Sequence, residues 1–248
     1  MLRTLLVCGL LAGAVAGVLA TGFASLAGEP AVNQAIAYEE ANAPHAHPGE
    51  HAHPGAEEEE VVSRATQSSF GLLTASTVYG LSLGGLFALV FSVAYGRVGR
   101  ASPAQTALWL AAAAFVVVYL VPFVKYPANP PAIGDPDTIG ERTLLYLSMV
   151  AISVLAAVAA VRLRTVLSRR VTGSSATLLA GASYLFVVVA AGLALPGIHE
   201  LPGDFPATTL WRFREASVGM HAVIWTTIGL VFAATARHTM AGKPIWQR

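Results

Sequence analysis

Charged residues are scarce in this sequence. Asp, Glu, Lys and Arg make up 12% of the 248 residues, while hydrophobic residues make up 55%. A soluble domain carries about 25% charged residues. This scarcity excludes an ordinary soluble domain and indicates a chain that exposes much of its surface to lipid.

Cysteine and two common catalytic signatures are also missing. The single cysteine, Cys8, excludes a disulfide within the chain and a cluster of thiolate ligands. The sequence contains no Gly-x-x-x-x-Gly-Lys-[Ser/Thr] phosphate loop and no His-Glu-x-x-His zinc motif. Its basic residues fall in short clusters between apolar segments, where membrane orientation explains them. We therefore expect neither an enzyme nor a nucleic-acid-binding protein.

Long apolar segments are what the sequence has instead. Each is about long enough to cross ~30 Å of hydrocarbon as a helix that rises 1.5 Å per residue. Because backbone polar groups must be satisfied within lipid, such segments are expected to be helices. The sequence therefore predicts an all-α, polytopic helical membrane protein with six transmembrane helices, near residues 5–26, 70–95, 106–124, 144–161, 176–195 and 217–236.

The first apolar segment allows two interpretations. Arg3 and the small residues at 25–27 resemble a cleaved signal peptide, which would leave five spans. The apolar run is longer than the about 7–15 residues of a usual signal, however. It also places Gly9, Gly13 and Gly17 at every fourth position, which is typical of a helix-packing face in membranes. We favour a retained helix.

Basic and acidic residues are divided unevenly between the two sides of the predicted bundle. With a cytoplasmic N-terminus, ten Lys and Arg residues fall on the cytoplasmic side, and all fourteen Asp and Glu residues fall on the outer side. An excess of basic residues marks the cytoplasmic side. Both termini are therefore predicted to be cytoplasmic, and the acidic outer face should concentrate cations. The five outer basic residues are Arg64, Lys125, Arg142, Arg212 and Arg214.

Histidine is concentrated in a polar outer segment, residues 27–69. A hexapeptide, His-Ala-His-Pro-Gly-Glu, is almost repeated there, and four glutamates follow. Neutral imidazole is a ligand for Zn, Cu, Ni and Co ions. We predict a long disordered loop that captures divalent metal, and a low-complexity polar linker is the alternative. The predicted ligands are His45, His47, His51 and His53.

Capture by such a loop does not select cobalt. Imidazole ligands follow the Irving–Williams order, which places Cu and Ni above Co. Nickel, zinc and copper therefore stay open as substrates on this feature alone. With an ordinary imidazole pKa of about 6.5, metal binding should weaken as the pH falls through about 6.

Other candidate ligands lie in or near the remaining outer segments. His221 falls within the last predicted span, about one turn below its outer end, where ionisable groups are often functional. We predict a second metal-binding site, made of His199, Glu200 and His221. For His221 the alternative is a histidine bonded to a neighbouring helix. Asp135 and Asp137 offer carboxylate ligands, or else turn and cap positions before a helix that begins near 139–142.

Three features carry a resemblance to a known family. They are the glycine-rich first span, the histidine-rich segment after it and, most specifically, Lys125-Tyr-Pro-Ala-Asn-Pro-Pro-Ala-Ile-Gly-Asp-Pro-Asp-Thr-Ile-Gly. With these features the chain resembles, over essentially its whole length, the CbtA-type predicted cobalt transporter subunits of bacteria. The resemblance implies an inner-membrane location, cobalt uptake tied to cobalamin synthesis, and a small single-span, histidine-containing partner of the CbtB type. Members are usually described with five spans.

The predicted organisation is a first helix at 1–26, an outer loop at 27–69 and a membrane domain of five helices at 70–248. The predicted function is a membrane subunit of a divalent metal uptake transporter, with cobalt as the substrate that the resemblance implies. A membrane-tethered metal buffer without transport and a structural membrane subunit are the alternatives. Assembly as a homo-oligomer in the lipid bilayer is compatible with this organisation.

Overall fold

A computed structural model of the chain describes residues 2–42, 63–97, 101–131, 133–198 and 200–240. In these ranges the chain is helical and has no β-strand. Six helical segments are long and apolar enough to cross a membrane, which confirms the predicted fold class. They are Leu2–Asn42, Arg64–Ala94, Pro103–Lys125, Ile139–Leu167, Gly173–Ala194 and Ala207–Arg237.

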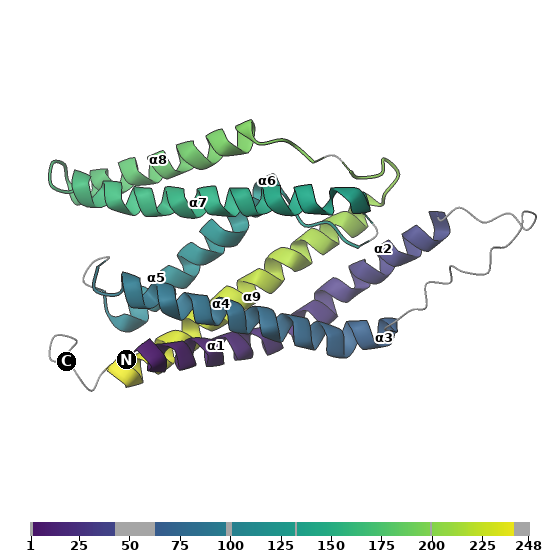
Figure 1. Ribbon diagram of the computed structural model, residues 1–248, viewed down its shortest axis with the longest axis horizontal. Coiled ribbons are helices and arrows are strands. Elements are labelled where there is room, and N and C mark those ends of the chain that lie inside the picture. Colours follow the sequence, from purple (N-terminus) through teal and green to yellow (C-terminus); the bar gives the residue numbers. More distant parts are fainter. Residues whose placement is uncertain (1, 43–62, 98–100, 132, 199, 241–248) are drawn as a thin grey trace, which may run out of the picture.

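Three of the six segments contain π-helical turns between their α-helical parts (Figure 1). The first runs through α1 (Leu2–Phe23), η1 (Ala24–Gly28) and α2 (Glu29–Asn42), and the second through α3 (Arg64–Thr66), η2 (Gln67–Gly71) and α4 (Leu72–Ala94). The third runs through α5 (Pro103–Ala114), η3 (Phe115–Leu120) and α6 (Val121–Lys125). After the 3₁₀ turn η4 (Pro136–Thr138) come α7 (Ile139–Leu167), α8 (Gly173–Ala194) and α9 (Ala207–Met240).

The first helix continues well beyond the predicted span. The segment 27–69 was expected to be a loop, but α2 occupies its beginning and α3 its end. Packing accounts for the longer helix, because Ala31 and Ala35 on α2 are buried and Tyr38 contacts Phe205 edge-on at a centroid distance of 5.0 Å. The four predicted metal ligands His45, His47, His51 and His53 lie outside the described residues.

Glycine allows α1 and α4 to touch backbone to backbone. A Cβ atom added at Gly13 would overlap the carbonyl oxygen of Gly80, and one added at Gly9 would overlap that of Gly84. Close approach of this kind is how small residues stabilise helix pairs in lipid, where apolar side chains gain little from leaving the solvent. The predicted glycine face is therefore a packing face, and α1 is an integral part of the bundle, as a retained helix requires.

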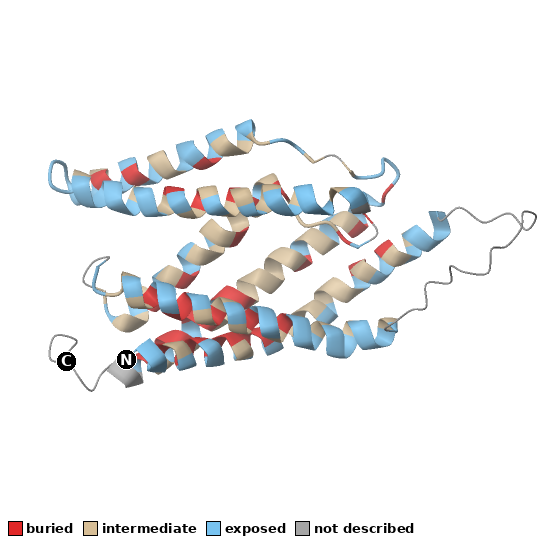
Figure 2. Ribbon diagram, viewed as in Figure 1, coloured by how far each residue is buried: buried red, intermediate tan, exposed pale blue. Residues whose placement is uncertain are grey.

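The core lies where α1, α4, α5 and α9 meet. Phe91 on α4 contacts Phe232 on α9 edge-on at 4.8 Å, and Ile224 and Ile228 on α9 are fully buried in the same cluster. Figure 2 shows the buried residues gathered along α1 and α4. By contrast, α7 and α8 form a hairpin that lies beside this group and presents mainly exposed residues.

The ends of the helices sort the connecting segments into two groups. The N-terminus of α1, the α4–α5 connection and the α7–α8 connection lie toward one end of the molecule (left in Figure 1). The outer ends of α2 and α3, residues 126–138 and residues 195–206 lie toward the other end. This is the grouping that six alternating spans require, and we call the second group the outer end, following the predicted orientation.

The α1–α4 contact predicts a position-specific response to a single methyl group. Gly13→Ala should destabilise the protein by about 1–3 kcal/mol, because the added Cβ overlaps backbone that cannot move aside cheaply. Gly22→Ala is the matched control on the same helix, since a Cβ there meets nothing within 4 Å. Thermal unfolding in detergent measures both, and equal midpoints would contradict the proposed packing.

Candidate functional site

A proline-rich loop crosses the outer end of the bundle, and we call residues 126–138 the roof loop. Prolines at 127, 130, 131 and 136 prevent a continuous helix there because they lack the backbone N–H and fix φ. Gly134 has a φ of 109°, a left-handed conformation that a side chain would strain. The loop ends at Thr138, and α7 begins at Ile139, where the sequence predicted a helix start.

The roof loop is tied at its start to the segment that follows α8. Lys125 Nζ donates a hydrogen bond to the carbonyl oxygen of Leu195 at 2.9 Å. The Tyr126 hydroxyl donates to the carbonyl oxygen of Pro196, also at 2.9 Å. These two bonds satisfy the carbonyl groups of the two residues that follow α8.

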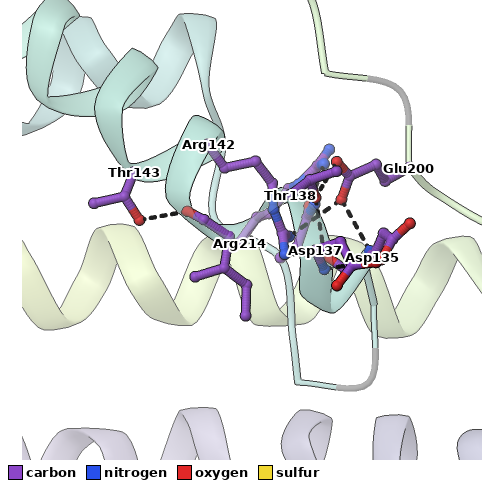
Figure 3. A network of polar contacts seen from close by, with 9 residues as sticks. Asp135, Asp137, Thr138, Arg142, Thr143, Glu200 and Arg214 are labelled. Carbon is purple, nitrogen blue, oxygen red and sulfur yellow. Dashed lines mark hydrogen bonds and ion pairs between the residues drawn. The ribbon is translucent and has the colours of Figure 1, made fainter.

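Glu200 holds the other end of the roof loop (Figure 3). Its Oε1 accepts a hydrogen bond from the Thr138 hydroxyl at 2.7 Å, and its Oε2 accepts one from the backbone N–H of Asp135 at 3.2 Å. Arg142 Nη1 lies 3.3 Å from Oε2 as an ion pair. A Cβ at Gly134 would overlap the Arg142 guanidinium, so the clamp requires glycine at that position.

A third tie comes from α9. Arg214 Nε donates to the carbonyl oxygen of Ala128 at 3.2 Å, and Arg214 Nη2 donates to Asn129 Oδ1 at 3.0 Å. The roof loop therefore rests on the post-α8 segment on one side and on α9 on the other. A loop with prolines and this many side-chain ties is pre-organised.

His221 lies on α9 among aromatic side chains. Its ring stacks on Tyr119 with centroids 3.6 Å apart and an interplanar angle of 11°. Nδ1 lies 3.0 Å from the carbonyl oxygen of Ser217, and Nε2 lies 3.3 Å from the Tyr79 hydroxyl. Because a carbonyl oxygen only accepts, Nδ1 carries the proton in the neutral ring. The lone pair of Nε2 is then the one that accepts from Tyr79 or binds a metal.

The position of Tyr119 follows from a proline further along its helix. Pro122 has no N–H to donate to the carbonyl of residue 118, and the preceding turn η3 is π-helical. Tyr119 belongs to this widened turn, where it is buried, and its hydroxyl lies 2.9 Å from the Ser217 hydroxyl. The π turn thus holds the ring against His221.

A cavity of about 550 Å³ lies between the roof loop and His221. Helices α6, α7 and α9 form its walls, together with residues that follow α8. Its polar lining includes three cationic side chains, Lys125, Arg142 and Arg214, and one carboxylate, Glu200. Tyr119, Tyr126 and Tyr146 add aromatic surface. The volume falls within the range of about 300–1,000 Å³ that is typical of small-molecule sites.

The structure brings together some of the predicted site residues. Glu200 and His221 line the same cavity, whereas His199 lies outside the described residues. Asp135 and Asp137 are exposed, and Asp135 Oδ1 accepts a hydrogen bond from the backbone N–H of Asp137 at 2.9 Å, which is a turn role. Across the described ranges, no group of three or more His, Cys, Asp and Glu residues could hold a metal ion.

The sequence interpretation missed the cations that line the cavity. Lys125, Arg142 and Arg214 were counted only as charges that set the membrane orientation. A usable signal was present in α9, where Arg214, Ser217 and His221 follow the i, i+3, i+7 spacing of one helical face. Lys125 and Arg142 gave no such signal, because they meet Arg214 only through the tertiary fold.

The Glu200 clamp predicts that Gly134 cannot carry a side chain. Gly134→Ala should loosen the roof loop at a cost of about 1–3 kcal/mol, because it strains φ and overlaps Arg142. Hydrogen exchange followed by mass spectrometry should then show faster exchange in residues 126–138.

Gly203→Ala is the matched control for this change. Gly203 lies in the neighbouring segment 195–206, its φ is not positive, and a Cβ there meets nothing within 4 Å. Its exchange pattern should equal that of the unchanged protein. Identical patterns for the two variants would show that the clamp does not hold the roof loop.

Comparison with known proteins yields one match. A family model described as probable cobalt transporter subunit (CbtA) matches residues 2–237. The matched range begins with α1, ends within α9, and includes the roof loop, the Glu200 clamp and His221. Neither a curated protein nor a solved structure matches the chain.

Proposed function

The chain belongs to the CbtA family of probable cobalt transporter subunits, and on this premise we propose that it takes up cobalt across a bacterial inner membrane for cobalamin synthesis. Its six apolar helices make it a multi-pass membrane protein. Both termini face the cytoplasm and the outer end faces the other side, on the distribution of Lys and Arg. The protein transports an ion and catalyses no covalent reaction.

One observation carries this proposal: α2, which precedes the part of the histidine-rich segment that holds the four histidines, packs beside the roof loop. Ala35 on α2 belongs to one buried cluster with Ile133 of the roof loop and Phe205. The Thr209 hydroxyl on α9 donates to Gln34 Oε1 on α2 at 3.0 Å. The described helix that precedes the four histidines therefore lies against the roof loop and α9, which supports delivery of metal to the cavity.

The far end of the histidine-rich segment is tied to the same helix. Arg64, at the start of α3, forms an ion pair with Glu29 on α2. Arg64 Nη2 also donates to Asn33 Oδ1 at 3.1 Å. The described residues on the two sides of 43–62 thus belong to α2 or contact it, which supports a role in which His45, His47, His51 and His53 capture metal for the cavity.

The second metal-binding site is at His221, with Glu200 and His199 as further ligands. Nε2 of His221 carries the lone pair that is available to a metal. The hydrogen bond from the Tyr79 hydroxyl to Nε2 breaks when the metal binds. Glu200 exchanges its bonds to Thr138 and Arg142 for the metal. Asp135 and Asp137 are exposed carboxylates beside this site and attract the cation before it enters.

A partner subunit completes the transporter. We expect the single-span, histidine-containing CbtB-type protein in this role, with contacts inside the lipid bilayer. The exposed apolar faces of α7 and α8 leave room for contact with another helix or with a second copy of the chain. Nickel, zinc and copper would bind the histidine-rich segment as well, so discrimination depends on the cavity.

Replacing His221 should separate capture from passage. His221→Ala removes the Nε2 ligand and should abolish cobalt uptake, while metal bound by the histidine-rich segment stays unchanged. His238→Ala is the matched control, because it removes the same residue type from the other end of α9. Uptake of radiolabelled cobalt by cells measures both variants. Unchanged uptake in His221→Ala would refute the second metal-binding site.

Deleting residues 44–60 should lower uptake mainly when cobalt is scarce. The loop raises the local metal concentration, so its loss should lower uptake when cobalt is scarce and have little effect when cobalt is abundant. Uptake that is lost equally at all cobalt concentrations would contradict a role in capture.

Metal binding by the intact segment should decline as the pH falls from 7 through about 6, because protonated imidazole does not bind metal.

A further inference from the structure

The cavity beneath the roof loop has more positive than negative charge. Lys125 from α6, Arg142 from α7 and Arg214 from α9 converge on it, and Glu200 is the one carboxylate in its lining. Without metal, Glu200 forms an ion pair with Arg142. In the part of the chain that the structure describes, neither Lys125 nor Arg214 has a carboxylate within ion-pair distance. Among the described residues, two cationic side chains at the cavity therefore form no ion pair with a carboxylate.

The same side chains have more hydrogen-bond donors than the protein uses. Lys125 donates to Leu195, and Arg214 donates through Nε and Nη2, which leaves further N–H groups on both. Arg142 Nε is buried and has no hydrogen-bond partner within the described ranges. Buried N–H groups without acceptors are costly. A ligand rich in acceptor oxygens would satisfy them.

A bare divalent cation does not fit this charge pattern. Like charges repel, and the repulsion is strongest where little water screens it. Two of the residues proposed as ligands, His221 and Glu200, line the cavity, and the described residues supply no third ligand from His, Cys, Asp or Glu. Cobalt at this point requires additional donor atoms and a negative charge that offsets Lys125 and Arg214.

We propose that the cavity binds a small polycarboxylate anion, which Lys125 and Arg214 anchor and which supplies the missing oxygen ligands to the metal at His221. Guanidinium groups bind carboxylates through two parallel hydrogen bonds, which suits Arg214 to this role. The volume of about 550 Å³ accommodates an organic acid with a bound ion. The anion site itself does not depend on the proposed function, whereas the metal at His221 and its identity rest on it.

Citrate is the probe for this site, and the first measurement omits metal. The full-length protein is placed in nanodiscs of neutral phosphatidylcholine, so that no anionic headgroup competes for the cations. Isothermal titration should show saturable citrate binding that weakens with added salt. Arg214→Gln should weaken it by about tenfold or more, because the anion loses a partly buried charged partner.

Arg212→Gln is the matched control. Arg212 lies on the same helix, is exposed and does not line the cavity. Its replacement removes the same positive charge as Arg214→Gln. It should leave citrate affinity unchanged. Because Arg214 also holds the roof loop, Arg214→Lys serves as a second variant that keeps the charge and should recover part of the affinity. Unfolding midpoints identify any variant that has lost its fold.

Three results would overturn the proposal. They are the absence of citrate binding in the unchanged protein, an equal loss in Arg212→Gln and Arg214→Gln, and complete displacement of citrate when phosphatidylglycerol is added to the nanodiscs. The last result would identify a lipid phosphate as the occupant. None of these measurements involves cobalt transport, so the anion site and the transport function can fail independently.

A second titration tests whether the anion also supplies ligands to the metal. A preformed cobalt–citrate complex should bind more tightly than citrate alone, because binding of the anion and binding of the metal at His221 then stabilise each other. His221→Ala should remove the difference. Equal binding with and without metal in the unchanged protein would contradict this part of the proposal.

Discussion

The rest of the structure depends on the backbone contact between α1 and α4. In lipid, two apolar helices gain little by burying large side chains against each other, and close approach is what stabilises the pair. Gly13 opposite Gly80 provides that approach. With α1 held against α4, α9 packs on α1. Tyr79, the neighbour of Gly80, then meets His221 on α9.

Polar contacts at the outer end set the geometry of the cavity in a different way. The prolines of the roof loop restrict its backbone, and Glu200 and Arg214 tie it down from two sides. Both ties use charge-assisted hydrogen bonds, which are stronger than neutral ones. The roof loop thus bounds the cavity on its outer side, and His221, stacked on Tyr119, bounds it on the opposite side. This arrangement suits the proposed site, in which a metal is held together with a polycarboxylate anion.

The sequence predicted the features that depend on local pattern. The six spans, the packing role of Gly13 and the start of α7 follow from hydropathy, spacing and composition. The contact of His221 with Tyr79 on α4 matches the alternative of a histidine bonded to a neighbouring helix. The features it missed are those that only tertiary contacts create. Helix α2 is stabilised by Phe205, which lies far away in sequence. Thr138 occupies the N-cap position of α7, but its side chain bonds Glu200 and makes no cap hydrogen bond.

Cobalt accumulation inside sealed vesicles tests the central claim most directly. The protein is reconstituted with and without the proposed single-span partner, and radiolabelled cobalt inside the vesicles is measured after external metal has been removed with a membrane-impermeant chelator. A transport subunit predicts internal cobalt that rises with time when both subunits are present. Cobalt that the chelator removes completely, with none inside under either condition, would show a surface metal buffer and contradict the account.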